Sequence, residues 1–79
     1  FYGLELAYEA GRKGGSLPTV FNAANELAVS KFLNREIKYL EITEIIEDCM
    51  KAHKNIENPT LEQILETEAA TYERINSRR

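Results

Sequence analysis

The segment that decides the fold is residues 17–33, which read LPTVFNAANELAVSKFL. Two asparagines in the first turns are unusual for a helix, because their amides compete for nearby backbone groups. Asn22, Asn25 and Glu26 are spaced i, i+3 and i+4, so a helix gathers them into one polar stripe. The opposite face is apolar and carries Val20, Phe21, Ala24, Leu27, Ala28 and Phe32. We predict a helix over about 19–33, and its wide apolar arc indicates the central, most buried helix of a bundle.

Helical spacing of apolar residues continues before this segment, and β-type alternation is nearly absent from the chain. A first helix is expected over about 2–13, and Gly14-Gly15 supplies the left-handed residues that commonly stop a helix. Pro18 suits the first turn of the next helix, and Thr19 is the expected N-cap. The expected core stripe of the first helix consists of Leu4, Ala7, Tyr8 and Gly11.

A third helix is predicted over about 41–53, with its core stripe at positions i, +3, +4, +7 and +8. This stripe consists of Ile42, Ile45, Ile46, Cys49 and Met50. Between the second and third helices, Ile37 and Tyr39 alternate like a strand, but a lone stub has nothing to pair with. We therefore expect a loop there.

The last helix is predicted from a capping box at residues 60–63, Thr60-Leu61-Glu62-Gln63, to about Asn76. Its expected stripe consists of Leu61, Ile64, Leu65, Ala69, Tyr72 and Ile75. Thr67 can also serve as an N-cap and would then divide the segment into two shorter helices. The predicted fold is all-α, a small bundle of four helices, or five with that break.

Composition limits the function classes. The chain has 79 residues, enough for one small domain, and a formal net charge of −3 with a pI near 5.1. Nucleic acids and anionic membranes select clustered basic residues, whereas the only such pairs here, 12–13 and 78–79, stand at expected helix ends. No apolar run approaches the length of a membrane span, and we expect no signal peptide. We expect neither nucleic acid nor membrane as a partner.

Candidate chemistry is sparse. His53 is the only histidine and is interpreted as a surface residue near a helix end. Cys49 lies on the apolar stripe of the third helix, as expected for a small buried hydrophobic residue. The glycines lack the spacing of a phosphate-binding loop, and acidic pairs such as Glu41 and Glu44 are interpreted as a solvated face. We therefore expect no catalytic, cofactor-binding or metal-binding residue. The Asn22, Asn25 and Glu26 stripe either faces water or docks on another domain.

The central segment resembles the L-N-A-A-N-E segment of the 1-deoxy-D-xylulose 5-phosphate reductoisomerase family. Residues 1–11 look like that family's F-P-x-L-x-L-A-x-E-A-G opening, although Tyr2 replaces the usual proline. Residues 58–65 look like its x-P-T-L-E-D-V-L segment, and residues 68–74 like its terminal D-A-x-A-R-E helix, with Glu68 in place of aspartate. The resemblance covers nearly the whole chain.

The resemblance implies that residues 1–79 form the single C-terminal helical domain of a larger enzyme. In this family the whole enzyme converts 1-deoxy-D-xylulose 5-phosphate to 2-C-methyl-D-erythritol 4-phosphate with NADPH and a divalent metal (Mg or Mn), in non-mevalonate isoprenoid biosynthesis. The cofactor and metal would belong to earlier domains, so this fragment alone would be inactive. The implied partner is the central catalytic domain of a parent homodimer, in the bacterial cytoplasm or in the plastid stroma of a plant or alga. The alternative is a free-standing acidic helical protein-interaction module.

Overall fold

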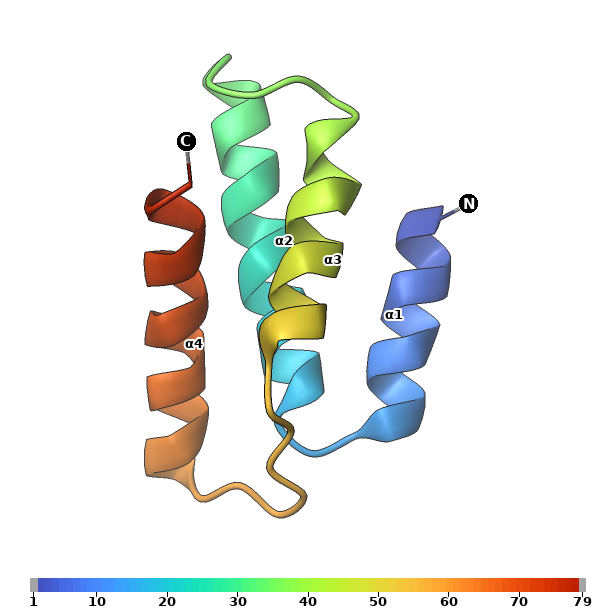
Figure 1. Cartoon of the computed structure of the whole chain (residues 1–79), viewed down its shortest axis with the longest axis vertical. Helices are drawn as coiled ribbons and strands as arrows, with labels where there is room; N and C mark the ends of the chain where they lie inside the picture. Colours follow the sequence, from blue (N-terminus) through green and yellow to red (C-terminus); the bar gives the residue numbers. More distant parts are fainter. Residues whose placement is uncertain (1, 79) are drawn as a thin grey trace.

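The computed structural model describes residues 2–78. These residues form four helices, namely α1 (Tyr2–Lys13), α2 (Leu17–Leu33), α3 (Glu41–Ala52) and α4 (Leu61–Asn76). Consecutive helices run in opposite directions, with α1 and α4 on opposite sides of the α2–α3 pair (Figure 1). Both α2 and α3 contact all three other helices, and α2 makes the more extensive contacts with α1 and α4. The predicted all-α bundle of four helices is therefore confirmed, as is the central position of the second helix.

The core lies mainly between α2 and α3. The apolar stripe predicted for α3 is confirmed, because four of its five members are buried and Ile42 packs against them. The apolar face predicted for α2 is likewise turned inward, with Phe21 and Leu27 partly buried at its margins. The buried members from the two helices are Val20, Ala24, Ala28, Ile45, Ile46, Cys49 and Met50.

The connection from α1 to α2 is a tight turn. Gly14 and Gly15 both have a φ of 66°, and the Gly14 amide donates to Ala10 O at 3.0 Å. These are the left-handed residues that end α1, as predicted. The N-cap prediction was wrong, because α2 already begins at Leu17, with Ser16 at the N-cap position and Thr19 inside the first turn. Pro18 lies in that first turn, where its missing N–H costs no helical hydrogen bond.

The predicted capping box of α4 is confirmed. Gln63 N donates to Thr60 Oγ1 at 3.1 Å, and Thr60 N donates to Gln63 Oε1 at 3.0 Å. The possible break at Thr67 does not occur, because α4 runs unbroken from Leu61 to Asn76. Thr67 is buried, and its carbonyl accepts a hydrogen bond from Thr71 Oγ1 at 2.8 Å. Buried packing along this face keeps the two halves of the segment in one helix.

The predicted core stripes of α1 and α4 were wrong in part. In α1 the buried residues are Leu6 and Ala10, whereas Leu4 and Tyr8 are exposed. In α4 the buried residues are Thr67, Thr71 and Ile75, with Ile64 partly buried, whereas Leu61, Leu65 and Ala69 are exposed. Both helices carry apolar residues on two sides, so the sequence period alone does not decide which side faces the core. The side that faces the core is set by contacts with α2 and α3.

Candidate functional site

The densest polar contacts in the described residues join the two connectors at one end of the bundle. We call the side chains of Ser16, His53 and Asn55 the Ser16 cluster. Ser16 Oγ lies 2.6 Å from His53 Nε2 and donates to Asn55 Oδ1 at 3.2 Å, while it accepts from Ile56 N at 2.9 Å. A hydroxyl has one hydrogen, so this set of contacts makes His53 Nε2 the donor to Ser16.

Backbone groups complete the Ser16 cluster. Ser16 N donates to Ile56 O at 2.9 Å, and Leu17 N donates to Asn55 Oδ1 at 2.9 Å. Asn55 Nδ2 in turn donates to Gly14 O at 3.2 Å. The amide of Asn55 thus supplies the acceptor that the first turn of α2 needs, in place of a side-chain cap from Ser16 itself. These bonds fix the α1–α2 connector to the chain that follows α3.

His53 lies near a helix end as predicted, at the C-cap of α3, but the interpretation as a surface residue was wrong in part. His53 is only partly exposed, and burial lowers the pKa of its imidazole below the ordinary value. Sequence reasoning missed the cluster because Ser16 and His53 are 37 positions apart. No local signal pointed to it, since the ordinary interpretation of a serine at a helix start is a side-chain cap, and Ser16 makes none.

The Ser16 cluster is not arranged for nucleophilic catalysis. A catalytic serine needs a histidine nitrogen that accepts its proton, and a reacting group must reach its oxygen. Ser16 has 0% of its surface exposed, and its hydroxyl already takes part in three contacts with protein groups. The geometry supports a structural role, holding two connectors together.

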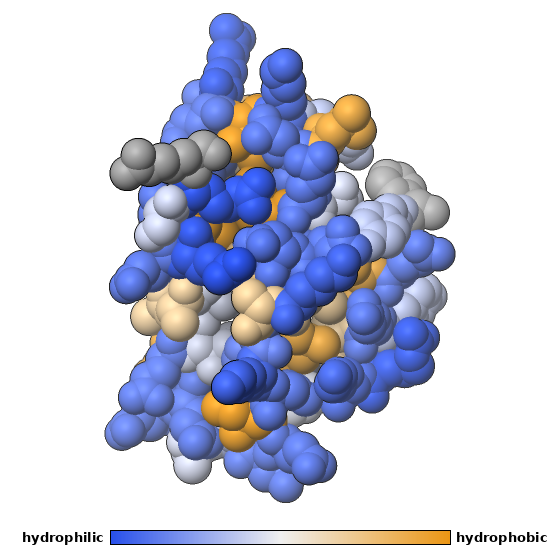
Figure 2. Space-filling view, viewed as in Figure 1, coloured by the Kyte–Doolittle hydropathy of each residue, from blue (hydrophilic) through white to orange (hydrophobic). Residues whose placement is uncertain are grey.

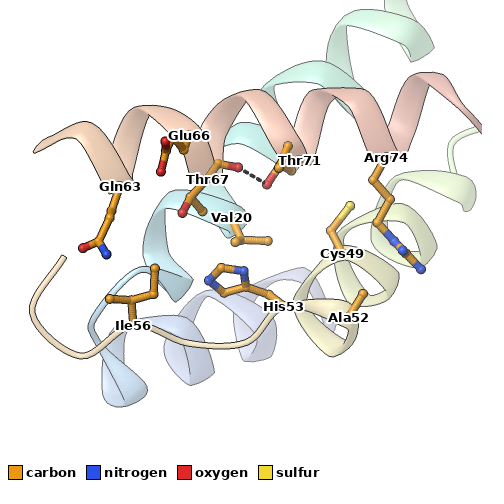
Figure 3. Close-up of a pocket in the computed structure, with 11 residues that line it drawn as sticks. Val20, Cys49, Ala52, His53, Ile56, Gln63, Glu66, Thr67, Thr71 and Arg74 are labelled. Carbon is orange, nitrogen blue, oxygen red and sulfur yellow. Dashed lines mark hydrogen bonds between the residues drawn. The ribbon is translucent and has the colours of Figure 1, made fainter. Parts of the chain in front are cut away.

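A cleft of about 410 Å³ lies beside the Ser16 cluster, between α4 and the chain formed by α3 and its following connector (Figure 3). His53 and Ile56 line it from one side, and Gln63, Glu66 and Thr67 line it from α4. The one hydrogen bond drawn among the lining residues joins Thr67 and Thr71 within α4. The cleft therefore presents one imidazole and one carboxylate without a bond that couples them.

Cys49, which also lines this cleft, is buried as predicted. Burial raises the pKa of its thiol, with the neighbouring Asp48 carboxylate adding to the shift. A raised pKa keeps the sulfur in its weakly nucleophilic thiol form. Cys49 is therefore a packing residue of α3.

Several acidic side chains are engaged by neighbouring groups. Asp48 accepts from Arg74 Nε at 2.9 Å and from a second guanidinium nitrogen at 3.1 Å, which lowers the pKa of Asp48. A guanidinium nitrogen of Arg78 lies 3.6 Å from the same Asp48 carboxylate. Arg79, the other member of the predicted basic pair, lies outside the described residues.

Glu47 accepts a hydrogen bond from the Tyr2 hydroxyl, and this bond raises the pKa of Tyr2 to about 12. Across residues 2–78, no three His, Cys, Asp or Glu side chains come together in a group that could hold a metal ion.

The stripe of Asn22, Asn25 and Glu26 lies on the exposed side of α2. Glu26 Oε1 accepts from the Tyr72 hydroxyl of α4 at 2.8 Å, and this bond raises the pKa of Tyr72 to about 12. One member of the stripe therefore joins α2 to α4. Both asparagine side chains are exposed to solvent in this domain.

None of the helices within residues 2–78 is long and apolar enough to cross a membrane.

Comparison with known proteins identifies the family. The family model for the "DXP reductoisomerase C-terminal domain" matches residues 1–74. The chain is 56% identical over 78 residues to a protein of Agathobacter rectalis named 1-deoxy-D-xylulose 5-phosphate reductoisomerase, covering 99% of this chain and 20% of that protein. Proteins of the same name from Lachnospira eligens and Lachnoclostridium phytofermentans are 55% identical over 78 residues and 59% identical over 71 residues. These matches cover 99% and 90% of this chain, and 20% and 18% of the respective relatives.

The chain thus spans about a fifth of the length of the curated relatives it matches. The alternative of a free-standing acidic interaction module finds no support in these matches. The four-helix fold and the match over nearly all of its residues lead to one conclusion. This chain belongs to the DXP reductoisomerase C-terminal domain family.

Proposed function

We propose that this chain is the single C-terminal helical domain of a reductoisomerase in non-mevalonate isoprenoid biosynthesis. The full-length enzyme, an oxidoreductase, would convert 1-deoxy-D-xylulose 5-phosphate into 2-C-methyl-D-erythritol 4-phosphate with NADPH. The observation that carries this proposal is the family match over residues 1–74, together with relatives of that name that are 55% to 59% identical.

Within that enzyme, we assign this domain a supporting role without catalytic, cofactor-binding or metal-binding residues. The glycines do not fit the phosphate groups of NADPH, because Gly11, Gly14 and Gly15 lie in or after a helix and not after a strand, and Gly15 faces the Ile56 carbonyl and Asn55. A divalent metal does not fit residues 2–78 either, because no three His, Cys, Asp or Glu side chains come together there. NADPH and the Mg or Mn ion would therefore bind to the part of the enzyme outside this chain.

The proposed partner of the domain is the central catalytic domain of its own enzyme, which would act as a homodimer. The exposed amides of Asn22 and Asn25 support docking through the outer face of α2, because amide groups can bond backbone groups of a facing domain. We place the enzyme in the cytoplasm of a bacterium, or in the plastid stroma if the chain comes from a plant or alga. Neither nucleic acid nor membrane is proposed as a partner, in keeping with the net charge of −3.

The experiment that tests this proposal uses the full-length protein that contains this chain. Purified protein should oxidise NADPH when 1-deoxy-D-xylulose 5-phosphate and Mg or Mn are added, and a chelator should abolish the reaction. The isolated domain should show neither turnover nor saturable NADPH binding at micromolar concentrations. A full-length protein that is folded and inactive on this substrate would refute the assignment of the enzyme. Saturable NADPH binding by the isolated domain would refute the supporting role.

A further inference from the structure

An apolar groove of about 390 Å³ lies along the seam between α2 and α3, at the end of the bundle away from the Ser16 cluster. Its lining includes Tyr2 at the start of α1, Asn25 and Val29 of α2, Leu40 of the α2–α3 connector, and Ile46 of α3. None of its lining residues is charged, whereas 29% of the residues in the whole chain are Asp, Glu, Lys or Arg. Such a surface fits an apolar, uncharged occupant.

The groove continues the line of α1. In Figure 1, α1 begins below the upper end of α3 and runs toward the lower end of the bundle, so it covers only the lower part of that side. The groove lies beyond the start of α1, and Tyr2 and Gly3 form its edge. The bond between the Tyr2 hydroxyl and Glu47 holds this edge against α3. Polypeptide entering α1 along the same line would therefore pass over the groove.

The connector ends in two exposed hydrophobic residues beside the groove. Leu40 is 76% exposed and Tyr39 is 58% exposed, although both are large hydrophobic residues. In Figure 2 this face of the molecule is largely covered by hydrophilic side chains, and hydrophobic side chains show at several places, among them the upper end, where Figure 1 places the connector. Exposed apolar residues gathered at one groove are typical of a surface that is covered in a larger assembly.

We propose that this groove receives the segment of the full-length enzyme that leads directly into α1. The inference rests on the proposed function, because it requires a parent chain in which this domain is C-terminal. The matched relatives supply the necessary length, since this chain corresponds to only 20% of the Agathobacter rectalis protein. The segment would place uncharged apolar side chains between α2 and α3, and the Asn25 amide would bond one of its peptide groups. The groove would thereby fix the orientation of the helical domain relative to the preceding one.

The test measures thiol accessibility in the full-length protein, with Leu40→Cys as the probe and Leu33→Cys as the matched control. Leu33 is also highly exposed, at 71%, but does not line the groove. Each variant is alkylated with N-ethylmaleimide in the native and the denatured state, and the labelled peptide is quantified by mass spectrometry. We expect Leu40→Cys to react about tenfold more slowly in the native than in the denatured state, and Leu33→Cys to differ by about twofold or less. Equal native reactivity of the two positions would overturn the proposal.

A photo-crosslinker attached to Leu40→Cys identifies the occupant. The expected product joins position 40 to a peptide just before Tyr2 in the same chain. A product with a distant part of the chain, or with a second copy of the protein, would overturn the assignment of this occupant. NADPH turnover of the wild-type protein is measured separately. Turnover without protection at position 40 refutes only the groove assignment, and protection without turnover refutes only the enzyme assignment.

Discussion

The two ends of this four-helix bundle differ in the hydrogen bonds that their connecting segments make. At the closed end, which we define as residues 14–16 with residues 53–60, side-chain and backbone bonds join the two connectors. At the open end, defined as residues 34–40 with the start of α1, the connector bonds mainly to its nearest turns. Arg35 there has a φ of 61°, which a non-glycine residue adopts at a steric cost.

With the docking proposed above, the closed end serves the stability of the domain itself and the open end serves its attachment to the preceding part of the enzyme. The closed end buries a polar cluster whose groups bond one another, so it has little left to offer a partner. The open end leaves Tyr39 and Leu40 exposed beside an uncharged groove. Substitutions at the closed end should therefore destabilise the isolated domain, whereas those at the open end should mainly affect contact with the rest of the enzyme.

The largest loss of stability is expected for Gly15→Ala. Gly15 has a φ of 66°, and an added Cβ would lie 2.3 Å from the Ile56 carbonyl oxygen. The left-handed backbone costs about 1–2 kcal/mol for an L-residue, and overpacking adds about 1–3 kcal/mol, so we expect roughly 3 kcal/mol in total. Gly14→Ala is the matched control, because Gly14 has the same φ of 66° and no atom within 4 Å of the added Cβ. Urea unfolding that shows equal losses for the two variants would contradict the close packing of the connectors.

Removal of the buried hydroxyl should come next in size. Ser16→Ala leaves the Ile56 amide and the His53 imidazole without their common partner, which should cost about 1–3 kcal/mol. Ser30→Ala on the exposed surface of α2 is the control and should change the free energy of unfolding by about 0.5 kcal/mol or less. Thermal and urea unfolding of both variants measure the difference. A neutral Ser16→Ala would show that the cluster adds nothing to the stability of the closed end.

The capping box of α4 should give a smaller effect. Thr60→Ala removes the acceptor of the Gln63 amide and should cost about 0.5–2 kcal/mol, and Gln63→Ala should cost less. Thr19→Ala is the informative comparison, since Thr19 lies inside the first turn of α2 and serves no cap. Denaturant unfolding should leave that variant near the wild type. If Thr19→Ala were the more damaging change, α2 would begin later than the structure shows.

The smallest effect concerns pH. Because burial lowers the pKa of His53, the folded domain binds this proton less tightly than the unfolded chain does. The free energy of unfolding should be highest above about pH 6.5 and should fall as the pH drops through that value toward the lower pKa of the folded state. His53 is the only histidine, so unfolding measured at about pH 7 and about pH 5.5 isolates its contribution. The His53→Gln variant should lose most of this slope, and an unchanged slope would assign it to other groups.

The helices themselves could be predicted from local sequence. The apolar stripe of α3, the capping box at Thr60 and the glycines after α1 each depend on residues a few positions apart. The inward faces of α1 and α4 could not be predicted in the same way, because each helix carries apolar residues on two sides. Ala10 and Thr67 are buried where larger residues nearby stay exposed. That choice depends on the surfaces of α2 and α3 against which these helices pack, and the sequence of a single helix does not encode them.

The polar groups of the candidate site could likewise be predicted only where they lie close together in the sequence. The polar stripe of Asn22, Asn25 and Glu26 could be predicted from helical spacing, and its members do lie together on the exposed side of α2. The Ser16 cluster could not, since it joins connectors about 40 residues apart in sequence. Its groups come together where the α1–α2 connector meets the chain that follows α3. Polar residues in connectors are common, so the types of residue alone do not predict this pairing.

Amide hydrogen exchange tests the contrast between the two ends most directly, when the isolated domain is compared with the full-length protein. The amides of Ser16 and Ile56 should exchange slowly in both, because each is bonded within the closed end. The amides of Tyr39 and Leu40 stand beside the groove in an exposed turn and should exchange fast in the isolated domain, and about tenfold more slowly in the full-length protein. Equally fast exchange of Tyr39 and Leu40 in both proteins would contradict the account, because the open end would then be uncovered in the enzyme as well.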